Sequence, residues 1–214
     1  MFNKTIKYFV SSAAIVVAFS ATTIANAAPV PFTLFNTGVN AAGLGLGGVA
    51  RGAADLHYDT ALVTDPVVVA SGAYLANSKS SQWIWANRSA GAATYTFKTT
   101  FDLTGFDAKT AEILGAWGAD NLGLDILING VSTGISLLTN TNLNYSQLND
   151  FSINTNFVSG LNTLEFVIQN TGGPGAFRAE LAGTANSTVP EPGSLALIGL
   201  ALAGLGWSRR KQLS

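Results

Sequence analysis

Residues 95–103 read Tyr-Thr-Phe-Lys-Thr-Thr-Phe-Asp-Leu, an alternation that places Tyr, Phe and Leu on one side of an extended chain and Lys and Asp on the other. Successive side chains of a β-strand point to opposite faces of the sheet, so this order gives one buried face and one solvated face. The same alternation returns at 164–169, Leu-Glu-Phe-Val-Ile-Gln, and at 177–181, Phe-Arg-Ala-Glu-Leu. The three stretches predict strands packed on a core, with Lys98 and Arg178 on solvated faces.

Turn-forming residues separate shorter candidate strands along the rest of the central segment. Asn129-Gly130 is a strong hairpin signal, because both residue types tolerate positive φ. The Gly-rich stretch 38–52 has neither strand nor helix periodicity and reads as a loop. Many short strands with such spacing predict an all-β fold, a β-sandwich of the jelly-roll kind. The shorter strands are expected at 31–36, 67–75, 82–86, 111–117, 124–131, 135–138 and 151–157.

The N-terminal end has the three parts of a secretory signal peptide. Lys4 and Lys7 precede an apolar run at 9–21, and Ala25-Asn26-Ala27 forms a small-residue cleavage box. We therefore expect a signal helix over residues 1–27, cut by signal peptidase between Ala27 and Ala28. A retained membrane helix is the alternative, but about 13 apolar residues are few for a span.

The C-terminal end has three parts in a fixed order. The triplet Pro190, Glu191, Pro192 precedes an uncharged run at 193–207, and the basic cluster Arg209, Arg210, Lys211 follows. Prolines on both sides of Glu191 favour an extended segment that a processing enzyme can read. The positive-inside rule places the basic cluster in the cytoplasm and the triplet on the far side of the membrane. The run of about 15 residues predicts a short transmembrane helix, and an ordinary single-pass anchor is the alternative reading.

This order of parts resembles the PEP-CTERM sorting signal of Gram-negative envelope and biofilm proteins. The resemblance covers residues 188–214 and implies processing by an exosortase at or near the Pro-Glu-Pro triplet. It also implies a route: export through the inner membrane, transient anchoring by the C-terminal helix, then the cell surface or extracellular matrix. Residues 28–187 would then be the exported β-sandwich domain.

Charge and composition exclude several classes of function for residues 28–187. The whole chain has 11 Lys and Arg against 12 Asp and Glu. Leaving out the basic residues and the one Glu of the two terminal segments gives a net charge of about −5 for the central domain. Such a surface does not suit nucleic acid, whose phosphates need basic partners. The absence of cysteine excludes disulfides, thiolate nucleophiles and thiolate metal sites.

Two stretches resemble strands of galactose-binding-like jelly rolls. They are Ala119-Asp120-Asn121-Leu122-Gly123 with 125–130, Asp-Ile-Leu-Ile-Asn-Gly, and the later 160–166, Gly-Leu-Asn-Thr-Leu-Glu-Phe. The resemblance covers about a third of the central domain. It implies that a ligand would be bound by loops at one end of the sandwich, although the fold alone does not name that ligand.

Three tryptophans are the candidates for binding a glycan. An exposed indole beside polar groups suits the apolar face of a sugar ring, and Trp83 and Trp85 would share a strand face. Trp117 is the third candidate. Large aromatic residues are usually core, so packing is the alternative for each.

Two sets of polar residues could bind a cation. Asp120, Asn121 and Asp125 offer hard oxygen ligands near a turn, which predicts a structural calcium ion, with turn formation as the alternative. Asp55, His57 and Asp59 alternate and could also hold a divalent cation. The structural alternative for that second set is a solvated turn in which His57 is hydrogen-bonded to a neighbour.

The sequence favours a non-catalytic protein. His57 is the only histidine and no G-x-S-x-G turn surrounds a serine, so a catalytic triad is not expected. A carboxylate-pair glycosidase is the remaining enzymatic alternative. Two classes lead: an anchored module that binds exopolysaccharide, and a structural or adhesive component of a biofilm matrix.

Overall fold

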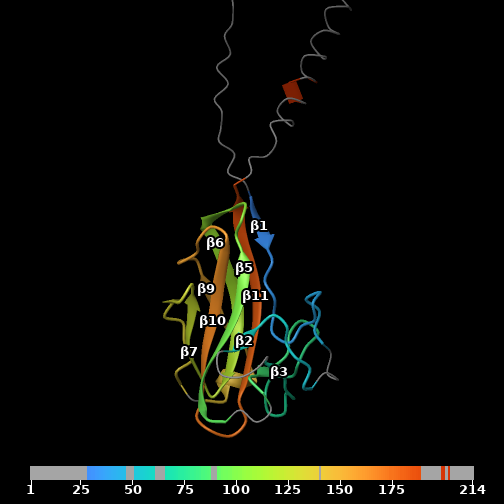
Figure 1. The fold of residues 1–214 in the computed structure, drawn as a ribbon, viewed down its shortest axis with the longest axis vertical. Helices are drawn as coiled ribbons and strands as arrows, with labels where there is room; N and C mark the ends of the chain where they lie inside the picture. The colour runs from blue at the N-terminus through green and yellow to red at the C-terminus, as the bar shows by residue number, and fades with distance from the viewer. Residues whose placement is uncertain are drawn as a thin grey trace, which may run out of the picture.

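The computed structural model describes residues 28–46, 51–60, 66–87, 91–139 and 141–188, together with residues 199, 200 and 202. In this part of the chain two antiparallel sheets form a β-sandwich (Figure 1). The sandwich predicted from the alternating stretches is confirmed. One helical turn, α1 (Leu143–Ser146), accompanies it at one end.

The first sheet is built on its longest strands, β6 (Phe106–Asp120) and β11 (Ala176–Ser187). Its strand order is β3 (Val67–Val68), β4 (Ile84–Trp85), β11, β6 and β9 (Asn149–Ile153), and β1 (Pro29–Phe32) also pairs with β11. The order in the second sheet is β2 (Asp59–Thr60), β5 (Ala93–Asp102), β10 (Leu161–Asn170), β7 (Leu122–Ile128) and β8 (Val131–Ser132).

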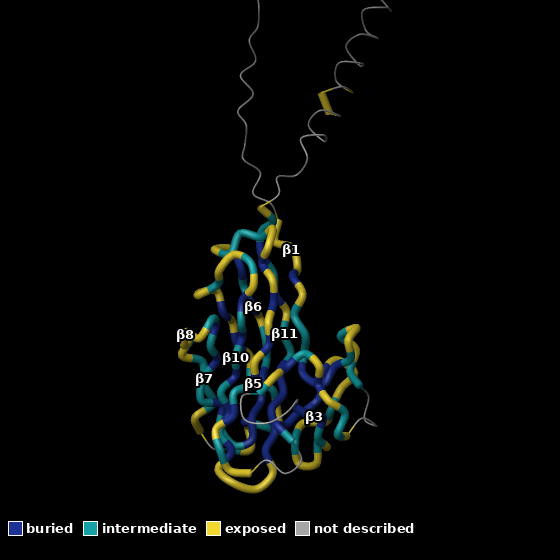
Figure 2. Tube along the Cα trace, in the orientation of Figure 1, coloured by how far each residue is buried: buried dark blue, intermediate teal, exposed yellow. Residues whose placement is uncertain are grey.

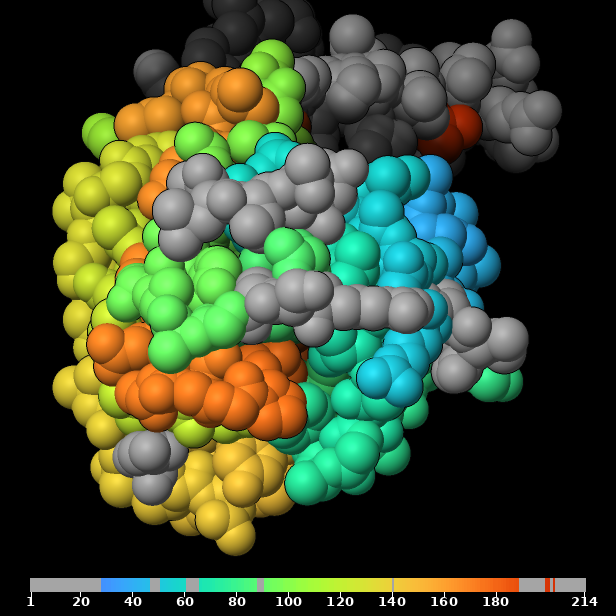
Figure 3. Space-filling model, turned by 60° about the horizontal axis from the view of Figure 1, so that its bottom comes forward, coloured from blue at the N-terminus to red at the C-terminus, as the bar shows by residue number. Residues whose placement is uncertain are grey.

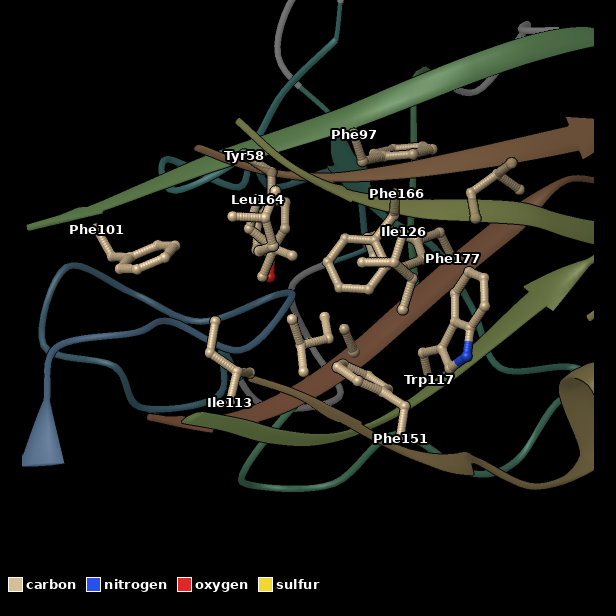
Figure 4. Close-up of a cluster of buried hydrophobic side chains, with 14 of the residues drawn as sticks. Tyr58, Phe97, Phe101, Ile113, Trp117, Ile126, Phe151, Leu164, Phe166 and Phe177 are labelled. Atoms are coloured by element: carbon tan, nitrogen blue, oxygen red, sulfur yellow. The ribbon is translucent and has the colours of Figure 1, made fainter. Parts of the chain in front are cut away.

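Aromatic rings from both sheets meet in the space between them. Phe97 and Phe166 point inward from the second sheet and Phe177 from the first, with centroids 4.9 Å and 4.8 Å from Phe177 (Figure 4). All three side chains are completely buried, and Figure 2 shows that buried positions run along the long strands. This is the core that the alternation of residues 95–103 and 164–169 predicted.

The two ends of the sandwich differ, and we call them the tail end and the loop end. At the tail end β1 pairs with the last residues of β11, from Pro29↔Asn186 to Phe32↔Gly183. At the loop end lie the last residue of β6, the helix α1 and the β10–β11 connection, residues 171–175 (Figure 1). The long strands hold the two ends apart.

Several strand boundaries differ from those expected. The strand expected at 111–117 is longer in both directions, whereas only Val67–Val68 of the stretch 67–75 is a strand. The stretch 135–138 forms a single bridge, Gly123↔Leu137, and no strand. The hairpin signal is confirmed, because Asn129 and Gly130 have φ of 53° and 75° between β7 and β8.

The placement of Arg178 corrects a sequence prediction. Its position on the outer face of β11 follows the alternation, but the side chain is buried rather than solvated. The segment before β4 covers it and bonds to it, as described below. Alternation therefore gave the correct face and the wrong environment, because a loop packs on that face.

Apart from residues 188, 199, 200 and 202, the predicted terminal segments lie outside the described residues. This applies to the cleavage box with Ala25 and Ala27, the triplet Pro190, Glu191, Pro192, and the basic cluster Arg209, Arg210, Lys211. Within the residues that are described, no helix combines the length and the apolar character needed to cross a bilayer.

Candidate functional site: a pocket at the loop end

A hollow of about 750 Å³ opens at the loop end of the sandwich, and we call it the loop pocket. Figure 3 shows this end, where the teal, yellow and orange loops come together. Each sheet contributes to it through the connections of its strands. Its walls are the segments 68–74 and 173–175, Gly91, and the side chains of Arg51, Trp85, Asn87, Asp120 and Tyr145.

The central polar contact of the loop pocket joins Tyr74 to Asp120. The Tyr74 hydroxyl donates a 2.9 Å hydrogen bond to Oδ2 of Asp120, and Asn121 Nδ2 donates to Oδ1 at 3.1 Å. Burial raises the pKa of the Asp120 carboxyl, and the Tyr74 hydrogen bond partly opposes this shift. Burial and the neighbouring carboxylate raise the pKa of Tyr74 well above its ordinary value, so its hydroxyl stays a donor at neutral pH.

Aromatic rings stand around this contact. The ring of Tyr74 lies 5.1 Å from Trp83 and 5.5 Å from Tyr145, centroid to centroid, and Tyr145 is T-shaped to it. Trp85 forms another wall, where Gly175 approaches its indole so closely that a Cβ there would overlap the ring. The loop pocket thus combines apolar ring surfaces with a hydroxyl and a carboxylate that are hydrogen-bonded to each other.

Side-chain hydrogen bonds tie the surrounding loops together. Asn144 Nδ2 donates to the backbone carbonyls of Asn121 and Leu137, at 2.8 and 3.3 Å. Asn121 Oδ1 accepts from both the backbone N–H and the hydroxyl of Thr171, at 2.8 and 2.9 Å. These bonds fix three separate connections relative to one another, so the shape of the pocket is largely preformed.

Arg178 holds the loop that precedes β4. Its guanidinium donates to the carbonyl of Ala76 at 2.8 Å and to the hydroxyls of Ser78 and Ser81 at 3.0 and 2.6 Å. It also pairs with Glu180 at 3.1 Å, and Ser81 donates to the same carboxylate oxygen. Because this loop continues from the segment 68–74, the buried Arg178 helps to place one wall of the loop pocket.

The three predicted glycan-binding tryptophans are interior residues. The exposed fractions of Trp83, Trp85 and Trp117 are 0%, 3% and 1%, so the expectation of an exposed indole is wrong for each. Trp83 packs between Gly118 and Tyr74, outside the core between the sheets, while Trp85 and Trp117 belong to that core. Only Trp85 also faces the loop pocket.

The predicted calcium ligands are not gathered at one point. Asp120 and Asn121 lie together at the loop pocket, with their side-chain oxygens hydrogen-bonded as described above. Asp125 follows Asn121 by four residues of extended chain, on the order of 13 Å, and its carboxylate accepts from the N–H of Ile126 at 2.8 Å. The described residues contain no group of three or more His, Cys, Asp or Glu side chains able to hold a metal ion. The calcium ion stays a prediction.

The hydrogen bond expected of His57 in the alternative to a cation site is present, but the turn is not solvated throughout, because Asp55 is buried. The Nε2 of His57 lies 2.9 Å from the carbonyl of Asn40, and its ring stacks on Phe35 with centroids 3.7 Å apart. Asp55 is fully buried and accepts from the N–H groups of Gly38 and His57, at 2.7 and 2.9 Å. These contacts hold the N-terminal loop in place, and both oxygens of the Asp55 carboxylate accept hydrogen bonds.

Sequence reasoning missed Tyr74 and Tyr145. Tyr145 lies outside every expected strand, whereas Tyr74 lies in the stretch 67–75, which was expected to be a strand and of which only Val67–Val68 is one. For Tyr145 the available signal was an aromatic residue in a segment rich in Ser and Asn, where it has no strand face to occupy. Asp120 was selected, but as a cation ligand rather than as the partner of a tyrosine.

The comparison with solved structures finds two carbohydrate-binding modules. CBM35 from Paenibacillus barcinonensis has 19% identity and a TM-score of 0.35, over 59% of this chain and 92% of that chain. A family 35 carbohydrate-binding module from an environmental isolate has 11% identity and a TM-score of 0.31, over 78% of this chain and 98% of that chain. At these scores the ligand has to be argued from the residues of this chain.

The C-terminal segment gives the more specific finding. No curated protein shows significant sequence similarity to the chain. Residues 188–211, however, match the PEP-CTERM protein-sorting motif, which agrees with the resemblance drawn from the order of triplet, apolar run and basic cluster. The chain thus ends in a PEP-CTERM sorting motif, which implies export, processing by an exosortase and sorting to the cell envelope or surface.

Proposed function

We propose that this chain is a non-catalytic binding module whose loop pocket takes one sugar unit of an extracellular polysaccharide. The observation that favours this ligand is the Tyr74–Asp120 pair set among the rings of Trp85 and Tyr145. A sugar ring has an apolar face and a rim of hydroxyls, so it suits a site with aromatic walls and a few fixed polar groups. The C-terminal sorting motif would direct this module to the cell envelope or surface.

The composition of the pocket also favours binding over hydrolysis. Glycosidases use two carboxyl groups, one as acid and one as base or nucleophile. Asp120 is the one carboxylate among the described residues that line the loop pocket. Its Oδ2 accepts from Tyr74 and its Oδ1 from Asn121, which suits a group that orients a ligand.

Binding can be tested with the purified full chain in mild detergent, on an array of bacterial exopolysaccharide fragments followed by calorimetry. The decisive variant is Tyr145→Ala, because Tyr145 is partly exposed and lines the pocket without entering the core between the sheets. We expect its affinity to fall about tenfold, or ~1.4 kcal/mol, with an unchanged melting temperature.

Leu143→Ala is the matched control, since Leu143 lies on the same helical turn, is 57% exposed and does not line the pocket. It should bind as the natural chain does. Equal losses in both variants would contradict the assignment of the pocket. Absence of binding to every polysaccharide would favour the second class of function, a structural or adhesive component of a biofilm matrix.

A further inference from the structure

The loop pocket and the sorting motif are joined to opposite ends of one strand. Gly175, a wall of the pocket, directly precedes β11, and Thr188, the first residue of the matched motif, directly follows it. At the pocket end Ala176 pairs with Asp120, and at the tail end Ser187 pairs with Phe106. The first and last of the 12 residues of β11 are 11 steps apart, roughly 36 Å at ~3.3 Å per residue.

The sandwich is stiff along this axis. β11 is paired with β6 along nearly its whole length, from Ala176↔Asp120 to Ser187↔Phe106, with one irregularity near Ala185. At the tail end the Thr188 N–H donates to the carbonyl of Gly105 at 2.9 Å, which fixes the point where the chain leaves the domain. Figure 1 shows the start of β1 and the end of β11 together at that end, where Pro29 pairs with Asn186. The attachment point and the loop pocket are therefore held apart by paired backbone.

The connection between domain and membrane segment is short. Four residues lie between Thr188 and Gly193, where the uncharged run begins, so five Cα–Cα steps join the two. Even fully extended they reach at most roughly 18 Å at ~3.6 Å per residue. To invert the domain so that the loop pocket points straight down at the bilayer, the attachment point would have to stand roughly 36 Å above the surface, which this length of chain cannot span.

We propose that the loop pocket faces away from the bilayer whenever the tail is in the membrane, so its ligand is a polymer beyond that membrane and not one of its lipids. This inference rests on the proposed function for the ligand class and on the geometry of β11 for the direction. It follows that the module can hold its polysaccharide before the tail is cut as well as afterwards.

The chain contains no cysteine, so a dye can be placed at one chosen position. Ser159→Cys and Ser146→Cys form a matched pair, because both serines are exposed. Ser159 precedes Gly160, whose carbonyl accepts from Leu103 at the tail end, whereas Ser146 ends α1 at the loop end. Full-length variants are reconstituted in phosphatidylcholine vesicles that contain a headgroup-labelled acceptor lipid. Tryptophan fluorescence verifies that each variant is folded.

We expect energy transfer to the lipid to be several-fold stronger from position 159 than from position 146. Equal transfer, or stronger transfer from position 146, would overturn the orientation. A second arm compares binding of an immobilised polysaccharide by the vesicles and by the full chain in mild detergent, with equal affinities expected. Missing polysaccharide binding in both forms sinks the proposed function and leaves the lipid measurement to decide the orientation. Binding by the chain in detergent alone would show that anchoring in a bilayer blocks the pocket and would contradict the inference.

Discussion

The long strand ladders and the loop end of this sandwich are stabilised by different interactions. β10 and β5 pair in register from Leu161↔Asp102 to Asn170↔Ala93, and their inward side chains bury large apolar surfaces. The loop end instead depends on single polar side chains, above all Arg178 and Asn144, that bond to the backbone of neighbouring loops. The comparison teaches that the free energy of folding and the shape of the pocket depend on separate residues, so mutation should be able to separate them.

The largest expected effect comes from the core. Phe166→Ala removes a fully buried ring in contact with Phe177 and Trp117, and should lower the free energy of unfolding by about 3–5 kcal/mol. Urea denaturation followed by tryptophan fluorescence measures it. Leu161→Ala, in the same strand but 68% exposed, should change stability by less than about 0.5 kcal/mol. Similar effects of the two variants would mean that the two faces of β10 are assigned wrongly.

A smaller loss of stability, with a larger change in the pocket, is expected from Arg178→Ala. The change removes the Arg178 donor from the carbonyl of Ala76 and one of the two donors to the Glu180 carboxylate, which keeps its bond from Ser81; this should lower the free energy of unfolding by about 2–4 kcal/mol. Because the loop before β4 is released, polysaccharide binding should fall further than in Tyr145→Ala. Hydrogen exchange at residues 76–83 locates the change.

The control for Arg178 is Lys98→Ala, since Lys98 makes an exposed 3.8 Å ion pair with Glu165 on the outer face of the ladder. This pair should contribute less than about 1 kcal/mol. If residues 76–83 stayed protected from hydrogen exchange in Arg178→Ala and polysaccharide binding were unchanged, Arg178 would not shape the pocket. The proposed separation between residues that stabilise the fold and residues that shape the pocket would then be contradicted.

The same division explains what could be predicted from sequence. Period-two alternation reports which side chains face a sheet, so Phe97, Phe166 and Phe177 were placed correctly in the core. It does not report whether a loop covers the outer face, which is why Arg178 was expected in solvent and why the sequence left open whether Trp83 is exposed or packed. The pocket brings Tyr74, Asp120 and Tyr145 together from three connections, and no local pattern encodes such a meeting of residues distant in the chain. The sorting tail is recognised by the linear order of its triplet, apolar run and basic cluster, so the sequence was enough to predict it.

A subtler difference between the ends concerns two carboxylates. Hydrogen bonds from the hydroxyl and the N–H of Thr104 hold the pKa of Asp102 below its usual value, whereas burial raises the pKa of Asp120. Asp102 therefore stabilises the fold above the pKa of an unfolded Asp, and this is lost as pH falls through its lowered pKa. The contribution of Asp120 has the opposite sign: it is present below the unfolded pKa and is lost as pH rises through the raised one.

Tyr74→Phe tests this contrast, because the Tyr74 hydrogen bond lowers the pKa of Asp120. Its removal should raise the pKa of Asp120 further and leave that of Asp102 unchanged, as measured by NMR titration of the side-chain carboxyl carbons. In wild-type protein, stability relative to Asp120→Asn should decline as pH rises from about 4 towards neutrality. A pKa of Asp120 at or below the ordinary value would contradict the burial of this group.

The smallest expected effect is that of calcium, which would act on the loop end alone. The oxygens of Asp120 and Asn121 already accept from Tyr74 and Thr171, so a cation has to compete with these hydrogen bonds and should bind weakly. An ion that binds only the folded state raises stability by RT ln(1 + [L]/Kd), which is about 0.4 kcal/mol when its concentration equals Kd. We therefore expect a small rise in the melting temperature in millimolar calcium, absent with chelator and lost in Asp120→Asn. Asp125→Asn should keep the calcium effect, because Asp125 lies apart from Asp120 and Asn121. Loss of the effect in this variant would mean that Asp125 binds the ion together with those two residues. A melting temperature that changes with neither calcium nor chelator would contradict the calcium prediction. The loop end would then be stabilised by its hydrogen bonds alone.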